Sequence, residues 1–249
     1  MATAGYSIME LLRAALWNVH PEDPGLDADQ WLELLQFADQ HKLLPLVLDS
    51  AIGLPSCLST KAAKGSAPAE SPSRAGGRPQ TWRDYAIEQV GRQAIQENEF
   101  LNLILEMREA GLEPVVVKGA VCRALYPKPL LRPSVDDDLL IPAEQAAAFH
   151  RFLLDHNLAP DEPDYDVKAA WELSYHRPNS PLYIEVHKCL FDPASPVFSG
   201  WNAWFAGAIE RSVPIQIQDV SLRTLHPTDP ALYHPGWNAS WINLAPIPS

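Results

Sequence analysis

One stretch without large apolar side chains most constrains how the chain can fold. Residues 59–81 contain no Val, Ile, Leu, Met, Phe, Trp or Tyr and consist mainly of Ala, Gly, Ser, Pro and scattered charges. Such a composition cannot bury enough apolar surface to offset the entropy lost on ordering. We therefore predict a flexible linker or surface loop over 55–81, with a docking segment for a partner as the alternative. It separates a small part, residues 1–54, from a larger one, residues 82–228.

The small part shows the periodicity of helices. Apolar residues recur at intervals of three and four over 7–19 and again over 29–41, and a third apolar segment covers 43–50. This spacing places the apolar side chains on one buried face of each helix. Asp27 or Asp29 is suited to cap the second helix. We predict a helical N-terminal unit.

The larger part alternates helical and extended patterns. A long helical pattern ends at Gly111, and the β-branched run that follows it is typical of a buried strand. The predicted strands are 114–117, 136–141, 182–187 and 213–220, and the predicted helices are 82–110, 120–125, 143–156 and 201–211. This order predicts an α/β (α+β) fold with a small mixed sheet. The Pro-rich tail 229–249 is expected to be poorly ordered, docked or truncated.

Charge and composition exclude several classes of protein. The 249 residues include 19 Lys+Arg and 31 Asp+Glu, a net charge of −12, and the most basic stretch has no interleaved aromatic residue, so a nucleic-acid partner is not expected. No apolar run reaches the roughly 18 residues of a membrane span. Glu10 and Arg13 interrupt the first apolar pattern, so we predict no signal peptide. Cys57, Cys122 and Cys189 have neither disulfide nor zinc spacing. We expect a cytoplasmic protein without a membrane partner.

Two acids in the second predicted strand indicate a cation site. In extended backbone Asp136 and Asp138 project from the same face, about 7 Å apart along the strand. Two such carboxylates repel each other unless a hard divalent ion neutralises them. The alternative is a solvated acidic turn at the start of a strand.

A third acid has a matching context in the strand 182–187. The alternation of this strand puts Glu185 on its polar face, where it could complete a cluster with Asp136 and Asp138. Three acids can hold two Mg²⁺ ions, roughly 3.5–4 Å apart, as in two-metal phosphoryl chemistry. The alternative for Glu185 is an exposed ion pair with Lys188 or Arg177.

Basic and glycine residues nearby favour a phosphate ligand. Lys118 and Gly119 end the Val-rich strand ahead of a predicted helix, where glycine allows close approach and the helix N-terminus offers N–H groups. Lys118 would supply a countercharge. Arg132 could add a planar donor fork, although it is also suited to anchor a loop. The turn lacks the pattern of a P-loop.

Together these segments resemble a known family. The runs Val116–Ala120, Tyr126-Pro127, Leu131–Ile141 and Ile184–His187 look like the uncharacterised nucleotidyltransferase family, part of the polymerase-β-like nucleotidyltransferase superfamily. The resemblance covers roughly residues 101–228. It implies a mixed-sheet fold and transfer of a nucleoside monophosphate from an NTP.

The resemblance also assigns residues. The family's D-x-D acids fall on Asp136 and Asp138, its third acid on Glu185, and its Lys-Gly turn on Lys118 and Gly119. Asp137 departs from the pattern, which usually has an apolar residue there. We expect Asp137 to lie near the exposed start of the strand, to be paired, or to mark weakened function. Members of the family also tend to continue into a helical C-terminal region, whereas the sequence here has a Pro-rich tail, which puts the acceptor side of the site in doubt.

These patterns favour a magnesium-dependent nucleotidyltransferase. Asp136, Asp138 and Glu185 would be catalytic and hold two Mg²⁺ ions, with Glu185 or Asp138 as the base. The triphosphate of an NTP such as ATP would contact Lys118, Gly119 and Arg132. The acceptor, a small molecule or a protein, is not defined by the sequence.

Two other hypotheses remain open. One is a catalytically impaired, antitoxin-like binding module that keeps the fold, and the other is a kinase-like phosphoryl transferase that uses the same acids. His187 shares the face of Glu185 and is interpreted as a supporting or purely structural neighbour.

Overall fold

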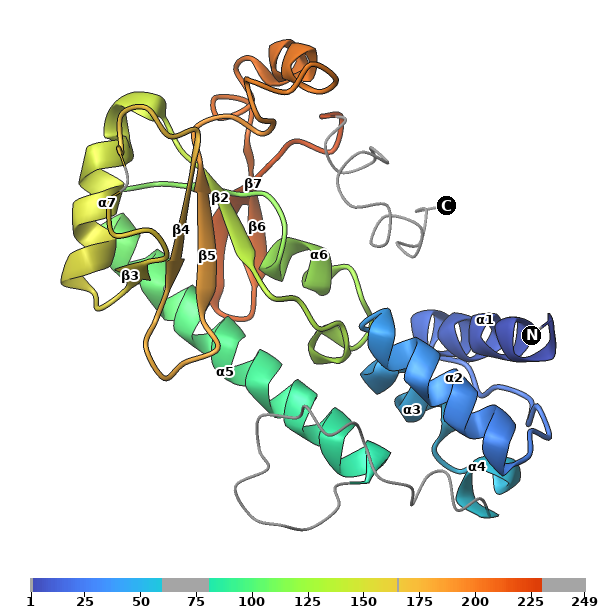
Figure 1. Ribbon diagram of the computed structural model, residues 1–249. Helices are drawn as coiled ribbons and strands as arrows, with labels where there is room; N and C mark the ends of the chain where they lie inside the picture. Colours follow the sequence, from blue (N-terminus) through green and yellow to red (C-terminus); the bar gives the residue numbers. More distant parts are fainter. Residues whose placement is uncertain (1, 60–80, 165, 230–249) are drawn as a thin grey trace. The chain divides into compact units, whose positions relative to one another are not determined.

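A computed structural model describes residues 2–59, 81–164 and 166–229 (Figure 1). Within these ranges the chain forms two compact units, which divide inside helix α5 (Trp82–Glu109). The first unit contains residues 2–93 and 126–133, and the second contains 94–125 and 134–229. Except for Asp229, the predicted tail lies outside the described residues. No helix in the described ranges is long and apolar enough to cross a bilayer.

The first unit is helical, as the apolar spacing predicts. Besides the start of α5 it contains α1 (Ala2–Trp17), α2 (Ala28–Gln40), α3 (Leu44–Ala51) and α4 (Pro55–Ser59). Asp27 caps α2, because its side chain accepts hydrogen bonds from the backbone N–H groups of Asp29 and Gln30. Helix α4 occupies the first residues of the predicted linker, and residues 60–80 of that linker lie outside the described ranges.

The second unit is built on a mixed seven-stranded sheet with the order β3-β4-β5-β2-β1-β7-β6. The strands are β1 (Val115–Val116), β2 (Asp137–Leu140), β3 (Ala159–Pro160), β4 (Glu172–His176), β5 (Tyr183–His187), β6 (Val213–Ile217) and β7 (Val220–Thr224). β2 runs parallel to β5 and antiparallel to β1, and β1 runs parallel to β7. The predicted mixed α/β fold is therefore confirmed.

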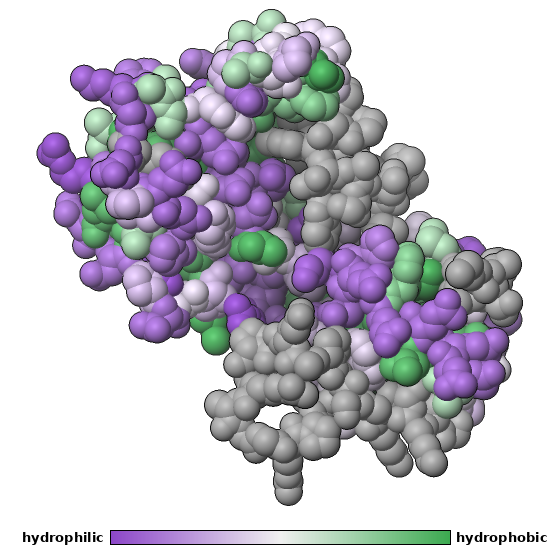
Figure 2. Space-filling view, in the orientation of Figure 1, coloured by the Kyte–Doolittle hydropathy of each residue, from purple (hydrophilic) through white to green (hydrophobic). Residues whose placement is uncertain are grey.

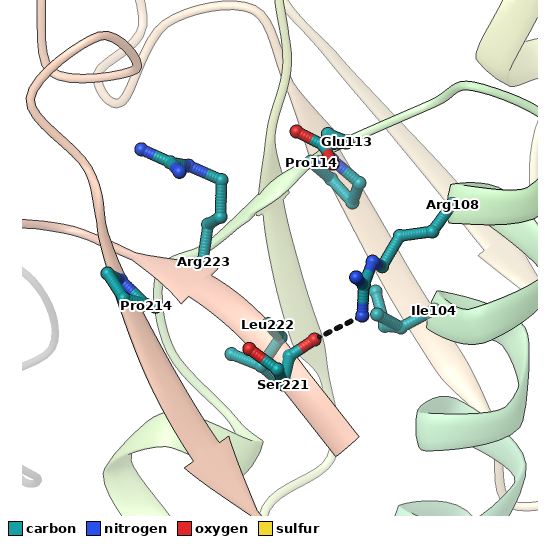
Figure 3. A pocket seen from close by; sticks show the side chains of 8 residues that line it. All are labelled: Ile104, Arg108, Glu113, Pro114, Pro214, Ser221, Leu222 and Arg223. Atoms are coloured by element: carbon teal, nitrogen blue, oxygen red, sulfur yellow. Dashed lines mark hydrogen bonds between the residues drawn. The ribbon is translucent and has the colours of Figure 1, made fainter.

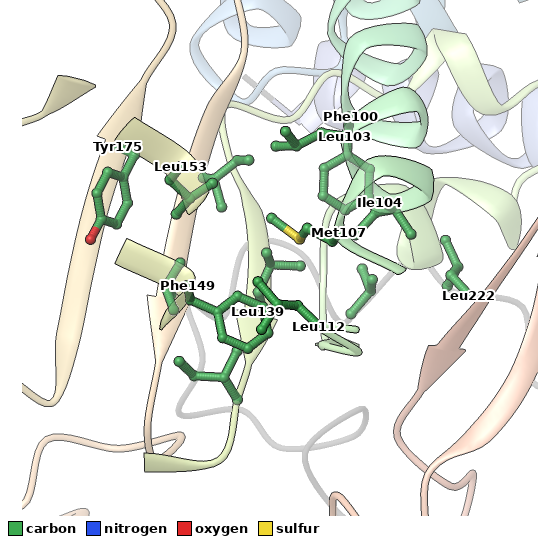
Figure 4. Close-up of a cluster of buried hydrophobic side chains, with 14 of the residues drawn as sticks. Phe100, Leu103, Ile104, Met107, Leu112, Leu139, Phe149, Leu153, Tyr175 and Leu222 are labelled. Atoms are coloured by element: carbon green, nitrogen blue, oxygen red, sulfur yellow. The ribbon is translucent and has the colours of Figure 1, made fainter. Parts of the chain in front are cut away.

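One face of this sheet is packed against helices. Side chains of α5 and of α7 (Ala146–Asp155) meet those of the central strands in one buried cluster (Figure 4). Phe100 and Met107 come from α5, Phe149 from α7, and Leu139 and Ile184 from β2 and β5. Because side chains alternate along a strand, the residues before and after these ones face the other way.

The opposite face is divided into an apolar and a polar region. Near β1 and the end of β2, a second cluster packs Val115, Val117 and Leu140 under Phe191 and Phe205. Phe205 is the last residue of a 3-10 helix, η3 (Ser199–Phe205). Beyond this cluster, the same face of β2, β5 and β4 carries polar residues. In Figure 2 the visible surface of this unit is mostly hydrophilic.

Several predicted elements differ from the structure. The single strand predicted over 213–220 is wrong, because β6 and β7 form a hairpin that turns at Gln218, a residue with a positive φ of 51°. The helix predicted over 201–211 is only the short η3, and Trp204 is 58% exposed although the helical spacing predicts a core position. β3 and β4 were not predicted. The remaining helices of the second unit are α6 (Ala120–Ala124) and η2 (Ala143–Gln145), and a further 3-10 helix, η1 (Pro129–Leu131), belongs to the first unit.

Candidate active site

The parallel pairing of β2 and β5 brings two of the three predicted acids, Asp138 and Glu185, together. Asp138 is the direct cross-strand partner of Glu185, and Asp136 precedes β2 by one residue. One ligand atom from each of Asp138, Glu185 and His187 lies within 4.8 Å of the others. The structure thus gathers side chains that could hold a metal ion, and it adds His187 to the acids inferred from the sequence.

Asp138 is the centre of this cluster and is fully buried. Its Oδ1 lies 2.7 Å from Nζ of Lys118 and 3.1 Å from Nε2 of His187. Burial alone would raise the pKa of Asp138, but the hydrogen bond with His187 and the charge of Lys118 lower it below its ordinary value. Its Oδ2 is also buried and has no hydrogen-bond partner among the described residues. That oxygen is the one available to a ligand.

His187 is held by acids on both sides. Its Nδ1 lies 3.4 Å from a carboxylate oxygen of Glu172, and its Nε2 lies 3.6 Å from one of Glu185. Burial would lower the pKa of His187, but its contacts with Asp138 and Glu185 raise it to about 9. Without a bound cation, His187 is therefore an imidazolium at neutral pH and donates to Asp138. In the sequence, the face that His187 shares with Glu185 indicates that these two residues are neighbours, but it does not indicate the contact with Glu172.

Asp136 and Lys118 belong to the same electrostatic environment. Burial, followed by the charge of Asp138, raises the pKa of Asp136 to about 6. For Lys118 burial acts in the lowering direction, but Asp138 outweighs it and the pKa of the ammonium is raised. Lys118 therefore remains charged beside the acids. Asp136 carries a proton when the pH is below about 6 and no cation is bound.

Asp137 points to the other face of the sheet and is completely buried. Its Oδ1 accepts a hydrogen bond of 2.7 Å from the backbone N–H of Ala120, and its Oδ2 accepts one of 3.0 Å from Gln96. Nη2 of Arg123 lies 3.2 Å from Oδ1. Burial raises the pKa of Asp137, and Arg123 opposes that effect. Of the three expectations for Asp137, the structure shows the paired carboxylate.

The Lys118-Gly119 turn lies directly against β2. Gly119 has a φ of +61° and a ψ of −114°, and a Cβ there would lie 2.1 Å from Oδ1 of Asp137. Only glycine fits this contact. The N–H of Ala120 was expected to be free for phosphate, but it donates to Asp137. This glycine therefore serves the packing of the turn on β2, and its contact with phosphate stays a prediction.

Arg132 belongs to the first unit. Its side chain is buried, and its guanidinium carbon lies 5.6 Å from the centre of the Tyr126 ring. This cation–π contact is of the kind that anchors a loop. The predicted contact of Arg132 with a triphosphate stays a prediction.

Two cavities of the second unit lie apart from the predicted site residues. A cavity of about 140 Å³ is lined by residues of α5, β6 and β7, among them Arg108 of α5 and Arg223 of β7 (Figure 3). A larger one, of about 340 Å³, lies where β2 and β5 end, and Leu140, Lys188 and Asn202 are part of its wall. None of the six residues predicted to bind metal or nucleotide lines either cavity.

The acidic cluster has the chemistry of a divalent-cation site. Asp138 offers a buried oxygen that has no hydrogen-bond partner in the part of the chain that the structure describes, and Glu185 is half-buried beside it. Burial and the charge of Asp138 raise the pKa of Asp136. Mg²⁺ prefers carboxylate oxygens of this kind. A cation would relieve the repulsion that these acids otherwise experience.

Carboxylates from two strands of a mixed sheet, next to a lysine, define the class of protein: an α/β protein with a centre suited to a cation and to phosphate. The sequence matches the uncharacterised nucleotidyltransferase family over residues 27–234, and the chain belongs to that family. No curated protein matches it significantly. Among solved structures, the lincosamide antibiotic adenylyltransferase LnuA with bound lincomycin is similar at a TM-score of 0.43 and 12% identity, over 60% of this chain and 96% of that one.

Proposed function

We propose that the protein is a divalent-cation-dependent nucleotidyltransferase that transfers a nucleoside monophosphate from an NTP to an acceptor hydroxyl. The family supports nucleotidyl transfer in general. The observation that carries the proposal for this site is the buried Oδ2 of Asp138, which has no partner among the described residues while Lys118 and His187 hold Oδ1 of the same carboxylate. Oδ1 of Asp138 is held by these two side chains, and Oδ2 would contact a ligand.

The residues that would hold the cation are Asp136, Asp138 and Glu185. We propose that these three acids bind two Mg²⁺ ions. A bound cation would neutralise phosphate charge and lower the pKa of the attacking hydroxyl. His187 would act on Asp138, because its Nε2 donates to Oδ1 and so leaves Oδ2 for the cation. Its positive charge makes it a poor direct ligand for a cation in this state.

Lys118 would contact the triphosphate. An ammonium has three donors, so Lys118 can keep its contact of 2.7 Å with Asp138 and still donate to a phosphate oxygen. Gly119 and Arg132 remain the other proposed contacts of the triphosphate.

Glu185 is the better candidate for the base. Its side chain is half-buried, whereas Asp138 has its Oδ1 occupied and its pKa lowered. In the proposed step the acceptor oxygen bonds to the α-phosphorus, the bond to the bridging oxygen of the β-phosphate breaks, and pyrophosphate leaves. The proton of the acceptor hydroxyl passes to Glu185.

The geometry bears on one of the two rival functions and does not separate the other. Asp137 is one of the two features that favour an impaired binding module, beside the Pro-rich C-terminal region, and it lies on the opposite face and is fully paired. A kinase-like transfer would use the same acids and differ in the phosphorus attacked. Product analysis separates it, because a kinase leaves a nucleoside diphosphate and a nucleotidyltransferase leaves pyrophosphate.

The test of the proposal is direct. We expect purified protein to bind Mg²⁺–NTP in calorimetry with a dissociation constant of about 1 μM to 1 mM. With a mixture of hydroxyl-bearing small molecules and proteins as acceptors, it should release pyrophosphate from at least one labelled NTP. Absence of both binding and release for all four nucleotides, with Mg²⁺ and with Mn²⁺, would reject the proposal.

Cation binding should depend on pH through Asp136. Its pKa of about 6 lies above the ordinary value of 3.8, so the folded, cation-free protein holds an extra proton between these values. This group therefore destabilises the fold as the pH rises from 4 to 6. A cation requires the carboxylate, so its apparent affinity should rise about tenfold from pH 5 to pH 7.

Calorimetry with Mn²⁺ at pH 5, 6 and 7 measures this effect. The matched variant Asp136→Asn should bind Mn²⁺ more weakly and with a smaller pH dependence, since it lacks the titrating carboxylate. An affinity of the unaltered protein that is constant from pH 5 to pH 7 would contradict the assigned role of Asp136.

A further inference from the structure

Asp137 lies between two proposed cation ligands, yet the proposed chemistry does not use it. Its carboxylate is on the opposite face of β2 and contacts the turn that carries Lys118. We propose that Asp137 is a positioning residue that fixes the Lys118-Gly119 turn against β2 and so holds Lys118 where it meets the triphosphate. This inference rests on the proposed function, and it adds to it a residue that touches neither cation nor nucleotide.

The turn is tied to β2 on both sides. Before it, the N–H of Val117 donates to the carbonyl oxygen of Asp138 over 2.9 Å. After it, the N–H of Ala120 donates to the side chain of Asp137 over 2.7 Å. Consecutive residues of β2 therefore hold the two ends of a loop of only two residues, Lys118 and Gly119. The second tie is made by a side chain, so it can be removed by substitution.

The absence of a side chain at Gly119 lets this tie form. Oδ1 of Asp137 occupies the place that a Cβ of Gly119 would take, at 2.1 Å. The backbone of the turn is therefore in direct contact with the carboxylate. An apolar side chain at position 137 would leave the N–H of Ala120 buried without an acceptor.

A buried network fixes the carboxylate in turn. Arg123 reaches Asp137 from α6, and its Nε lies 3.1 Å from a carboxylate oxygen of Glu97. Its backbone N–H donates to the carbonyl oxygen of Gly119 over 3.0 Å, so Arg123 is part of the same turn of chain. Gln96 of α5 holds the other oxygen of Asp137. All four side chains of this network are buried, so Asp137 is kept in one orientation.

The experiment compares three variants with the unaltered protein. Asp137→Asn keeps an acceptor oxygen for Ala120. Asp137→Leu is combined with Arg123→Met, so that no buried guanidinium is left without its partner. Tyr175→Phe is the control, because Tyr175 is a buried residue of the same unit and the substitution removes its partly buried hydrogen bond of 2.7 Å with His150. Circular dichroism checks that each variant is folded, and Asp137→Ser replaces the Leu/Met pair if that pair is not.

Three properties are measured on the full chain: hydrogen exchange at the amide of Ala120, affinity for Mn²⁺ alone, and affinity for Mg²⁺–ATP. We expect the Leu/Met pair to lose the exchange protection of Ala120 and to bind Mg²⁺–ATP at least about tenfold more weakly, while Mn²⁺ binding is kept. Asp137→Asn should keep most of the Mg²⁺–ATP affinity of the unaltered protein. Tyr175→Phe should match the unaltered protein in all three measurements.

The outcomes separate this inference from the proposed function. Equal Mg²⁺–ATP affinity in the Leu/Met pair and the unaltered protein would overturn the inference, and so would a parallel loss of Mn²⁺ binding, which indicates a general structural defect. If the unaltered protein binds no Mg²⁺–ATP, another Mg²⁺–NTP takes its place, and the proposed function fails if none of the four nucleotides is bound or releases pyrophosphate. The exchange measurement then decides alone: protection of Ala120 that is lost only in the Leu/Met pair supports the fixed turn, and unchanged protection overturns it.

Discussion

Replacing Asp138 with alanine should reduce nucleotidyl transfer by about 10³-fold or more. The substitution removes the buried oxygen that is proposed to face the cation and the acceptor that holds Lys118 and His187. Loss of a single preorganised donor in an enzyme costs roughly 10²–10³-fold in rate, and Asp138 serves both cation and lysine. The measurement is release of pyrophosphate from labelled NTP, with calorimetry of Mg²⁺–NTP binding beside it.

The matched control is Glu99→Gln. Glu99 is a half-buried acid of the second unit that, like Asp138, pairs with a basic side chain, since its Oε2 lies 2.8 Å from Nη1 of Arg177. We expect this variant to keep the activity of the unaltered protein. Transfer that survives in Asp138→Ala at a similar level would remove Asp138 from the mechanism.

A second signal shows whether Asp138→Ala acts through the contacts described here. The bond with Asp138 is the largest of the influences that raise the pKa of His187 to about 9, and burial opposes them. Without that carboxylate the pKa of His187 should fall. NMR titration of the His187 imidazole measures the change independently of catalysis, and an unchanged pKa would mean that the Asp138 contact does not control the charge of this histidine.

The acids of this site were predictable because strand alternation is a local property. Asp136, Asp138 and Glu185 were assigned from residues two apart in extended segments, and the pairing of β2 with β5 then places Asp138 opposite Glu185. His187 was placed on the same face by the same argument. The sequence does not indicate that a second acid, Glu172, lies beside His187, because Glu172 comes from β4, a strand that the sequence pattern does not predict.

The surroundings of Asp137 could not be predicted. Its partners Gln96 and Arg123 come from helices α5 and α6, and no periodic pattern relates a polar position on a helix to one residue of a strand. The sequence therefore leaves three expectations for Asp137 open: an exposed position, a paired carboxylate or weakened function. The hairpin of β6 and β7 was missed for a related reason, since Gln218 at its turn is not one of the usual turn residues.

Replacing Gly119 with alanine should destabilise the second unit by about 3–5 kcal/mol. Two effects add at this position. The backbone has φ +61° and ψ −114°, a conformation that residues with a Cβ rarely adopt. A Cβ would also lie 2.1 Å from Oδ1 and 2.8 Å from Cα of Asp137, and the second contact is with the backbone of a central strand, which cannot move away cheaply.

Gly111→Ala separates the two effects. Gly111 also has a positive φ, of +76°, but no atom of the described residues lies within 4 Å of the position that its Cβ would take. Its substitution should cost only the backbone strain, about 1–2 kcal/mol. Urea unfolding followed by the fluorescence of the tryptophans measures both variants. If Gly119→Ala costs no more than Gly111→Ala, the turn does not lie against Asp137 as described, and the positioning role of that carboxylate fails with it.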